Sequence, residues 1–555
     1  MSTKYIFVTG GVVSGIGKGL TAASLGRLLK ARGLVVRNQK FDPYINVDPG
    51  MMSPTQHGEV FITDDGAETD LDIGHYERFT DVSLDIESDI TSGMVYRDVI
   101  NREREGGYHG ATVQVVPHII NEIKEHVFRL SRQSLPDVII TEIGGTVGDM
   151  ESLPYMEAIR QVSYQVGHKN VLFIHVTLIP YLRKAGEIKT KPTQHSVRKL
   201  LSMGIQPDIL VCRSEIPLDQ AVREKIALYC NVETDCVIQN LDVDSVYQLP
   251  LMLEAEGLAQ VACRKLGLEN CSEPDLNDWQ LLMLKHRTAY RNIRVALVGK
   301  YVSLQDAYLS VTEALKHAGI EKQTLVEVVW VSAEDLETGD PETILEDADA
   351  IIVPGGFGPR GMRGMIVAAE YARTRQIPFL GIGLGMQMAV VEFARHVAGI
   401  TGADSEEAEC AVGDKIFAMP ANAPAEMVQG FGHSPREQKP MRRGAHNCVI
   451  IEGTKIAEAY QKPVVSERHH HRREFCNQFR DRLAAAGLCY SGLSPDSELV
   501  EAVEIKDHPW FVGVQFHPEF KSRPTRPHPL FIALIAAALE RSEAKAKLEP
   551  KEVNA

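Results

Sequence analysis

The sequence predicts two α/β domains, each built on a mainly parallel β-sheet. Short apolar, β-branched runs recur in the first half, separated by longer segments of helical period, at 6–8, 138–140, 171–174 and 209–211. Similar runs restart after a polar stretch at 272–278, namely at 295–298, 325–330, 351–353 and 379–382. Runs that are apolar on both faces are typical of strands buried inside a parallel sheet. A glycine-rich loop also joins the first strand to a helix, as in many α/β proteins.

Composition excludes several classes of protein. The 555 residues are 44% hydrophobic and 24% charged, which is typical of globular proteins and excludes collagen-like and mostly disordered chains. The 59 Lys and Arg against 74 Asp and Glu leave a net charge of −15. That balance argues against a general binder of nucleic acid or of anionic membranes, although a local basic pocket for a phosphorylated small molecule is compatible with it.

We expect a cytoplasmic protein without a membrane span. Residues 5–10 are too short an apolar run, and too soon interrupted by glycine, to form a secretion signal. The longest apolar run, Leu530–Leu539, has ten residues, whereas a bilayer needs about 20. The nine cysteines include no CxxC pair, so neither a zinc site nor a disulfide framework is predicted.

The chain is predicted to divide near residues 280–292. We expect a first domain over 1–271, a linker over 272–292 that contains a helix at Trp279–His286, and a second domain over 293–541. The Lys-, Glu- and Ala-rich tail, 542–555, is expected to be disordered.

The first strand, Tyr5–Val8, leads into a glycine-rich loop at 10–19 and then a helix at 20–31. Glycines let backbone N–H groups surround a phosphate, and Lys18 adds a positive charge. The strict P-loop is one residue shorter and has Ser or Thr where this chain has Gly19. A glycine-rich turn without a ligand is the competing interpretation, but strand, glycines, lysine and helix follow in the order that phosphate binding requires.

Without a hydroxyl after Lys18, a metal ion must be held by other groups. The candidates are Asp70, Asp72 and Glu142, because Mg²⁺ prefers oxygen ligands. Glu142 ends an apolar strand and thus lies where open α/β sheets bind ligands. For any single aspartate, a solvated or capping carboxylate is the simpler interpretation. The segment 189–194, with two lysines and two threonines, is either a triphosphate site or an exposed basic loop.

Five blocks of the first half together resemble the CTP synthase family, namely 10–19, 40–50, 53–72, 142–151 and 189–194. The resemblance extends over the whole chain except the tail and about 410–439. It implies an amidoligase domain followed by a class I glutamine amidotransferase domain. Such enzymes use ATP to phosphorylate O4 of UTP, and ammonia then displaces the phosphate to give CTP. The resemblance also implies activation by GTP, feedback inhibition by CTP, and a homotetramer that in many members forms filaments.

The resemblance assigns roles to residues of the first half. ATP is expected at Ser14, Gly15, Ile16, Gly17, Lys18, Gly19, Leu20, Asp72, Leu241, Asp242 and Val243. UTP or CTP is expected at Ser14, Asp149, Met150, Glu151, Lys189, Thr190, Lys191, Pro192, Thr193, Gln194 and Lys225. Mg²⁺ is expected at Asp72 and Glu142, with Lys18 and Lys40 stabilising the transferring phosphoryl group. An ammonia passage is expected to open at Pro54, His57 and Val60.

The second half has the strand–turn–helix pattern that exposes a catalytic nucleophile. The strand 379–382 is followed by Gly383 and by a segment of helical period. Far downstream, His517 is the expected base and Glu519 its orienting carboxylate. The resemblance places glutamine at Gly356, Leu384, Gly385, Met386, Gln387, Glu407 and Arg472.

The nucleophile itself is missing. Class I amidotransferases have cysteine at the position of Gly383, and a hydrogen atom cannot attack the glutamine amide. We therefore expect glutamine hydrolysis to be abolished, while external ammonia still supports CTP formation. The run His469–His471 lies between arginines, which predicts a basic strip beside the glutamine site rather than a metal site.

Two other functions remain open. An inactive family member could be an assembly protein, but the presence of Lys18, Lys40, Asp72 and Glu142 argues against a pure scaffold. ATP-dependent incorporation of ammonia separates these two hypotheses. The chain could also be another P-loop amidoligase, of the dethiobiotin or cobyrinate type; the block 189–194 speaks against this, and competition by UTP decides it.

Overall fold

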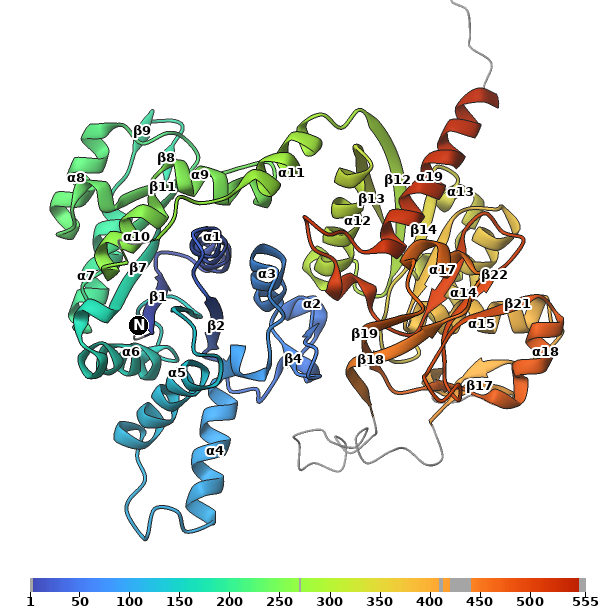
Figure 1. Cartoon of the computed structure of the whole chain (residues 1–555), viewed down its shortest axis with the longest axis horizontal. Helices are drawn as coiled ribbons and strands as arrows, with labels where there is room; N and C mark the ends of the chain where they lie inside the picture. Colours follow the sequence, from blue (N-terminus) through green and yellow to red (C-terminus); the bar gives the residue numbers. More distant parts are fainter. Residues whose placement is uncertain (1–2, 269–270, 409–412, 420–440, 549–555) are drawn as a thin grey trace, which may run out of the picture. The chain divides into compact units, whose positions relative to one another are not determined.

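The computed structural model describes residues 3–268, 271–408, 413–419 and 441–548, which form two compact units. Unit 1 comprises 1–51 and 69–283, and unit 2 comprises 52–68 and 284–555. Each unit has its own large sheet with helices around it, as the element labels of Figure 1 show. The α/β class predicted for both halves is confirmed.

The sheet of unit 1 has seven strands in the order β11-β10-β7-β1-β6-β2-β5, and all neighbours are parallel. Its strands are β1 (Lys4–Gly10), β2 (Val36–Asp42), β5 (Asp89–Thr91), β6 (Val138–Ile143), β7 (Val171–Leu178), β10 (Ile209–Ser214) and β11 (Val237–Leu241). The register places Val8 and Lys40 on either side of Glu142. The ends of three strands therefore meet at the edge of the sheet that open α/β folds use for ligands.

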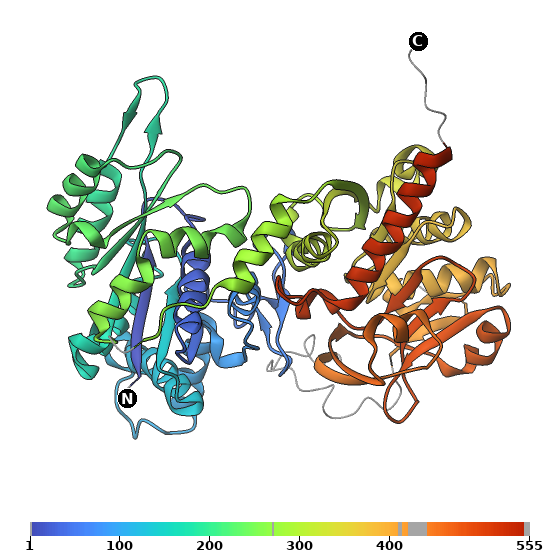
Figure 2. The same cartoon turned by 45° about the horizontal axis from the view of Figure 1, so that its top comes forward.

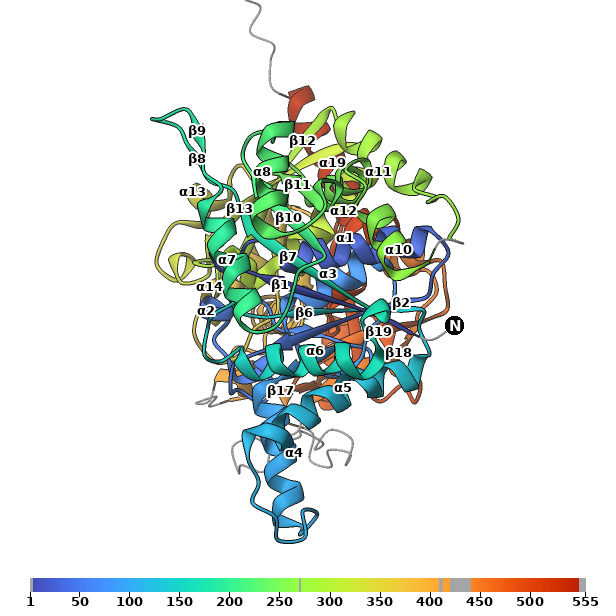
Figure 3. The same cartoon turned by 90° about the vertical axis from the view of Figure 1, so that its left-hand side faces the viewer.

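Helices cover both faces of this sheet. They are α1 (Lys18–Ala31), α3 (Leu71–Thr80), α4 (Ser92–Arg104), α5 (Ile120–Ser134), α6 (Leu153–Val166), α7 (Lys191–Ser202), α8 (Gln220–Cys230), α9 (Leu249–Ala255) and α10 (Leu258–Leu266). Figure 3 shows the strands between α5 and α6 on one side and α1, α3 and α10 on the other. Phe7 and Ile139 are fully buried in the core on the α5 and α6 side. Burial on both faces explains why these strands are continuously apolar.

A two-stranded hairpin extends from unit 1 beyond β7 (Figure 2). It is formed by β8 (Tyr181–Leu182) and β9 (Glu187–Ile188), paired antiparallel. The chain then returns through Lys189 and Thr190 into α7. The basic segment predicted at 189–194 is thus the first turn of a helix together with the two residues before it.

The sheet of unit 2 has nine strands in the order β13-β12-β14-β15-β23-β22-β21-β18-β19. Its strands are β12 (Arg291–Gly299), β13 (Thr324–Ser332), β14 (Ala350–Val353), β15 (Phe379–Ile382), β18 (Arg442–Ile450), β19 (Val464–His471), β21 (Leu488–Leu493), β22 (Val500–Ile505) and β23 (Phe511–Val514). The strands from β13 to β23 in this order pair in parallel, and the remaining pairs are antiparallel. A smaller sheet is formed by β16 (Asp404–Ser405), β17 (Lys415–Ala418) and β20 (Glu474–Phe475).

Helices and the segment 52–68 complete unit 2. The helices are α12 (Leu309–Glu321), α13 (Pro341–Leu345), α14 (Met362–Thr374), α15 (Leu384–His396), α17 (Lys455–Tyr460), α18 (Arg480–Ala485) and α19 (Pro529–Leu548). The segment 52–68 carries α2 (Pro54–His57), β3 (Phe61–Ile62) and the first residue of β4 (Glu68–Thr69). In the part of the chain described here, no helix combines the length and the apolar character needed to cross a bilayer.

The structure differs from the predicted division of the chain in two places. The segment 52–68, predicted to belong to the first domain, folds with unit 2. The tail predicted to be disordered from 542 is helical as far as Leu548, because α19 continues through it. Within the predicted linker, α11 (Asn277–Arg287) spans the boundary between the units. The stretch at 410–439 that matches the family poorly lies largely outside the described residues.

Candidate active sites

The glycine-rich loop of unit 1 joins β1 to α1. Gly15 and Gly17 have φ values of 67° and 94°, in the left-handed region that favours glycine. Gly17 is the N-cap of α1, which begins at Lys18, two residues before the predicted start. The Lys18 ammonium donates a hydrogen bond to the Gly145 carbonyl (2.8 Å), which lies in the loop after β6. The loop, its lysine and the end of β6 are therefore held together, with the helix N-terminus facing the same edge.

A buried ion cluster lies next to this loop. The Lys40 ammonium, at the end of β2, contacts Asp70 Oδ1 at 2.5 Å and Asp72 Oδ2 at 2.7 Å, and Asp42 Oδ1 lies 3.6 Å away. Burial alone would lower the pKa of Lys40, but the carboxylates around it, Asp42 and Asp70 foremost, hold this pKa well above its ordinary value. Lys40 therefore stays charged and fixes the positions of Asp70 and Asp72.

Glu142 lies in the same cluster, between the ends of β1 and β2. Its side chain is buried and accepts a hydrogen bond from the Tyr76 hydroxyl. Burial and the Asp72 carboxylate raise the pKa of Glu142 to about 7, although Lys40 and Lys18 act in the opposite direction. Burial alone would likewise raise the pKa of Asp72, but Lys40 and His75 outweigh it and the net shift is downward. Two neighbouring carboxylates whose pKa values are shifted in opposite directions are a typical arrangement at catalytic sites.

The structure explains why this loop departs from a P-loop at Gly19. A Cβ atom on Gly19 would lie 2.4 Å from Asp72 Oδ1 and 2.8 Å from Asp72 Cγ. The Asp72 carboxylate thus occupies the space where a P-loop serine or threonine would place its side chain. The carboxylate oxygens of Asp72, on α3, therefore lie next to the start of α1.

A pocket adjoins the glycine-rich loop at the ends of β7, β10 and β11. It is lined by Val13, Gly15, Ile16, Leu178, Ile179, Pro180, Tyr181, Arg213, Ser214, Glu215 and Asp242. Of the predicted ATP residues, Gly15, Ile16 and Asp242 lie in it, while Leu241 and Val243 flank Asp242 in sequence. Arg213 was not among the predicted residues; its guanidinium contacts Asp242 Oδ1 (2.9 Å) and donates to the Gly15 carbonyl (3.2 Å). Its position at the end of an apolar strand was the available signal.

The residues predicted for UTP or CTP come from four segments: Ser14 from the glycine-rich loop, 149–151 before α6, 189–194 leading into α7, and Lys225 on α8. Thr193 and Gln194 are buried on α7, where the Thr193 hydroxyl donates to the Leu178 carbonyl (3.1 Å). Gln194 Nε2 donates to Thr190 Oγ1 (3.1 Å), and Gln194 Oε1 is buried without a protein partner. Met150 and Glu151 line a different pocket, together with Pro43, Ile45, Ser92, Val95, Tyr96, Ile119, Ile123, Pro154 and Tyr155. Lys225 lies on α8. The pKa of Glu187 is lowered mainly by its hydrogen bond with Lys189 and to a smaller extent by the charge of Lys225.

The second site is a strand–turn–helix in unit 2. Gly383 follows β15 directly and precedes α15, with φ 53° and ψ −111°. A Cβ atom built on Gly383 would lie 3.2 Å from His517 Nε2, and His517 Nδ1 lies 2.7 Å from Glu519 Oε1. The predicted base and its carboxylate are therefore aligned on the position of the missing nucleophile.

A small pocket surrounds that position. It is lined by Gly355, Gly356, Phe357, Leu384, Gln387, Glu407, His470, His471, Arg472 and His517. Five of the seven residues predicted for glutamine line it. The other two pack into the core: Met386 is fully buried, and a Cβ on Gly385 would lie 1.9 Å from the Val353 carbonyl oxygen. Gly355 must lack a side chain, because a Cβ there would lie 2.6 Å from His517 Cε1.

Lys300 lies beside this pocket and was not among the predicted site residues. The Lys300 ammonium donates to the carbonyls of Phe357 and Gly358, and burial lowers the pKa of Lys300 to about 8. Gly358 in turn donates its N–H to Glu407 Oε1 (2.7 Å). Lys300 follows the strand β12 directly, so it shares the carboxyl-end position that pointed to the other site residues.

The segment 52–68 is attached to unit 2 by buried polar contacts. Glu59 accepts hydrogen bonds from the Ser310 N–H and hydroxyl at the start of α12. Arg468 is fully buried, contacts Asp64 Oδ1 at 2.7 Å and donates to the Ile62 carbonyl. The predicted passage residues Pro54, His57 and Val60 lie on this segment, so they fold with the unit that contains Gly383 and His517.

A further contact of the segment 52–68 involves a residue that lines the pocket, His470. Glu68 Oε1 lies 2.8 Å from His470 Nε2, and Glu68 Oε2 lies 2.8 Å from Arg443. Burial lowers the pKa of His470 even though Glu68 opposes the shift, so the ring stays neutral near pH 7. Of the histidine run, His470 and His471 line the pocket beside Arg472.

Comparisons with known proteins identify the family of the chain. A family model described as CTP synthase N-terminus matches residues 4–268, and one described as glutamine amidotransferase class-I matches residues 303–537. The CTP synthase of Ruminiclostridium cellulolyticum is 57% identical over 97% of this chain and 99% of its own length. That of Carboxydothermus hydrogenoformans is 56% identical over 98% and 99%. The glutaminase domain of Trypanosoma brucei CTPS, solved with bound acivicin, is 35% identical over 45% of this chain and 94% of its own length, with a TM-score of 0.40. The chain belongs to the CTP synthase family.

Proposed function

We propose that this protein aminates UTP to CTP with ATP and free ammonia, and that it no longer hydrolyses glutamine. The observation that carries the proposal is the buried cluster of Lys40, Asp70, Asp72 and Glu142 beside the glycine-rich loop. Fixed charges of both signs at the carboxyl edge of a parallel sheet are suited to positioning and stabilising a transferring phosphoryl group.

The reaction follows from the chemistry of the uracil carbonyl, whose oxygen is a poor leaving group. UTP O4 attacks the γ-phosphorus of ATP, ADP departs, and O4 becomes part of a phosphate ester. Ammonia then attacks C4, and the C4–O4 bond breaks so that inorganic phosphate leaves with O4. Lys18 and Lys40 hold positive charge near the phosphoryl oxygens while negative charge builds on them.

Asp72 and Glu142 fit a magnesium ion. They offer hard oxygen ligands, and burial together with the Asp72 charge raises the pKa of Glu142 to about 7, a penalty that a divalent cation held by both would relieve. When bound there with ATP, magnesium screens the charge of the phosphate oxygens. The chain's own part is to hold these two carboxylates in place through Lys40 and Tyr76.

In the second site, His517 and Glu519 have no nucleophile to activate. The pocket still offers Arg472, Glu407 and Gln387 to a polar ligand, so we propose that glutamine binds without being cleaved. By family membership we also propose GTP as activator, CTP as feedback inhibitor, and a homotetramer able to form filaments.

The test is an assay of CTP formation from UTP, ATP and magnesium with two nitrogen donors. We expect steady CTP formation with ammonium chloride at mildly alkaline pH, where more of the ammonia is unprotonated. With glutamine we expect a rate near background. Comparable rates with both donors would contradict the loss of glutaminase activity, and competition by excess uridine nucleotide analogues distinguishes this enzyme from other amidoligases.

A second prediction concerns Gly19. We expect Gly19→Ala to lower ammonia-dependent CTP formation on the order of 10- to 100-fold, because the added methyl displaces Asp72 from Lys40. Gly402→Ala is the matched control, since its Cβ would meet nothing closer than 3.6 Å. Rates of both variants are compared at saturating ATP and UTP. An unchanged rate in Gly19→Ala would show that the position of Asp72 is unimportant.

A further inference from the structure

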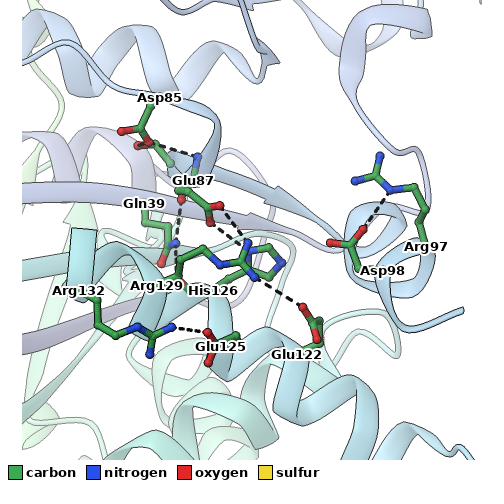
Figure 4. A network of polar contacts seen from close by, with 11 residues as sticks. Gln39, Asp85, Glu87, Arg97, Asp98, Glu122, Glu125, His126, Arg129 and Arg132 are labelled. Carbon is green, nitrogen blue, oxygen red and sulfur yellow. Dashed lines mark hydrogen bonds and ion pairs between the residues drawn. The ribbon is translucent and has the colours of Figure 1, made fainter. Parts of the chain in front are cut away.

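A second cluster of titratable groups lies in unit 1, away from the residues assigned to catalysis. Asp98 on α4, and Glu122 and His126 on α5, each bring one potential ligand atom to within 4.8 Å of the others. Figure 4 shows the three side chains converging from the two helices. Glu122 and His126 are four residues apart, which places them on one face of α5. We call these three residues the α4–α5 cluster.

His126 has the geometry of a metal ligand. His126 is 4% exposed, and its Nδ1 lies 3.2 Å from Glu87 Oε2. Its Nε2 is buried without a hydrogen-bond partner. In Figure 4 the ring lies between Glu87 on one side and Asp98 and Glu122 on the other. If Nδ1 donates its proton to Glu87, the lone pair of Nε2 is directed into the cluster with nothing to accept it.

The Glu87 contact is the kind of outer-shell interaction that orients metal-ligating histidines. A carboxylate on the non-ligating nitrogen fixes the tautomer and the ring orientation. Glu87 is itself held by Arg129 Nη1 (3.0 Å), and its main-chain carbonyl accepts a hydrogen bond from Gln39 Nε2 (2.9 Å). Burial would raise the pKa of Glu87, but its hydrogen bonds with His126 and Arg129 lower it, so Glu87 is ionised.

The two carboxylates are partly occupied by arginines. Arg102 contacts Glu122 Oε2 at 2.9 Å, and Arg129 lies 3.8 Å from Glu122 Oε1. Arg97 contacts Asp98 Oδ1 at 3.1 Å. The arginine side chains are 27% to 47% exposed, whereas that of Glu122 is 2% exposed. The guanidinium groups can therefore turn towards solvent while the carboxylates stay in place.

We propose that Asp98, Glu122 and His126 bind one divalent transition-metal ion of the zinc class and thereby tie α4 to α5. One imidazole and two carboxylates form a ligand set of intermediate hardness. It suits Zn²⁺, Co²⁺ or Mn²⁺ better than it suits Mg²⁺ or Ca²⁺, which prefer sites made of oxygen ligands alone. Ligand atoms about 2.1 Å from one ion lie at most about 4.2 Å apart, so small side-chain rotations close the present spacing.

Another cluster of the same composition is a natural control. Glu370, Glu392 and His396 also lie within 4.8 Å of one another, on α14 and α15. The His396 side chain is 42% exposed, and its Nδ1 already contacts Glu392 at 3.1 Å. Glu392 is further engaged by the Arg373 guanidinium through two nitrogens. It shows no buried, unpartnered nitrogen, so we expect no strong metal binding there.

The test uses the full chain in the absence of nucleotides. Co²⁺ is the probe ion. Equilibrium dialysis should show one more bound Co²⁺ per chain in the parent protein than in His126→Gln, together with visible d–d absorption that His126→Gln lacks. His396→Gln should behave as the parent does. Glu87→Gln should weaken binding about 10- to 100-fold, as expected of an orienting partner. Zn²⁺ should displace Co²⁺ and abolish the absorption.

Folding of each variant is checked by circular dichroism and by ammonia-dependent CTP formation, which none of these residues serves. Should His126→Gln fail to fold, Asp98→Asn replaces it, because the Asp98 side chain is 31% exposed and tolerates an isosteric change. Equal Co²⁺ binding by the parent and by the folded variant overturns the proposal. The comparison is carried up to millimolar Co²⁺.

Discussion

Replacing Gly383 by cysteine is expected to raise glutamine-dependent CTP formation on the order of 10³-fold or more, because loss of a catalytic nucleophile costs up to about 10⁶ in related hydrolytic sites. The Cβ position of residue 383 lies 3.2 Å from His517 Nε2, so an introduced thiol can give its proton to that base. Glu519 and the pocket residues are already in place. Ammonia-dependent CTP formation should not change.

The same substitution should destabilise unit 2. Residue 383 has φ 53° and ψ −111°, a conformation that glycine adopts readily and that costs other residues about 1–3 kcal/mol. Gly383→Ala is the control, since it carries the same strain without a nucleophile and should stay inactive with glutamine. Glutamate release and the free energy of unfolding are measured for both variants. If Gly383→Cys, correctly folded, releases no glutamate, another part of the glutaminase site is defective.

The second large effect is expected at Lys40. Lys40→Met should lower ammonia-dependent CTP formation on the order of 10³-fold, because it removes a fixed positive charge from the phosphoryl-transfer site. It also leaves Asp42, Asp70 and Asp72 buried without their shared cation. Breaking a buried ion pair in this way costs about 3–5 kcal/mol of unfolding free energy, so unit 1 should unfold at lower denaturant concentration.

Lys124→Met is the matched control for this experiment. Lys124 is also a buried lysine of unit 1, but its ammonium contacts the neutral Gln161 Oε1 (2.9 Å). Replacing Lys124 leaves no buried carboxylate without an ion-pair partner, so we expect little change in the rate of CTP formation or in the free energy of unfolding. A Lys40→Met protein that keeps its rate would remove Lys40 from the mechanism, whatever its stability.

Local patterns in the sequence were sufficient to predict much of the fold and the strand-end positions of several candidate site residues. The apolar runs became parallel strands, and the glycine-rich loop, Glu142 and Gly383 all lie at strand ends. Each of these features depends on residues adjacent in the chain, where the spacing itself carries the information. The predicted partnership of His517 with Glu519 is of the same kind, because only Pro518 lies between them in the chain.

Contacts between distant segments were not predictable in this way. No local pattern shows that 52–68 folds with unit 2, because the attachment depends on Glu59 with Ser310 and Asp64 with Arg468. The role of Gly19 depends on Asp72, 53 positions later, and became evident only from the space between them. The helix through Leu548 is a different error: Ala, Glu and Lys were interpreted as a disordered tail, although all three favour helix.

We propose that unit 1 turns O4 of UTP into part of a departing phosphate. The most direct measurement uses UTP labelled with oxygen-18 at O4, together with ATP, magnesium and ammonium chloride, and follows the label by mass spectrometry. We predict that every CTP formed is matched by one labelled inorganic phosphate. CTP formed without labelled phosphate, or no CTP at all from the folded enzyme, would contradict the account.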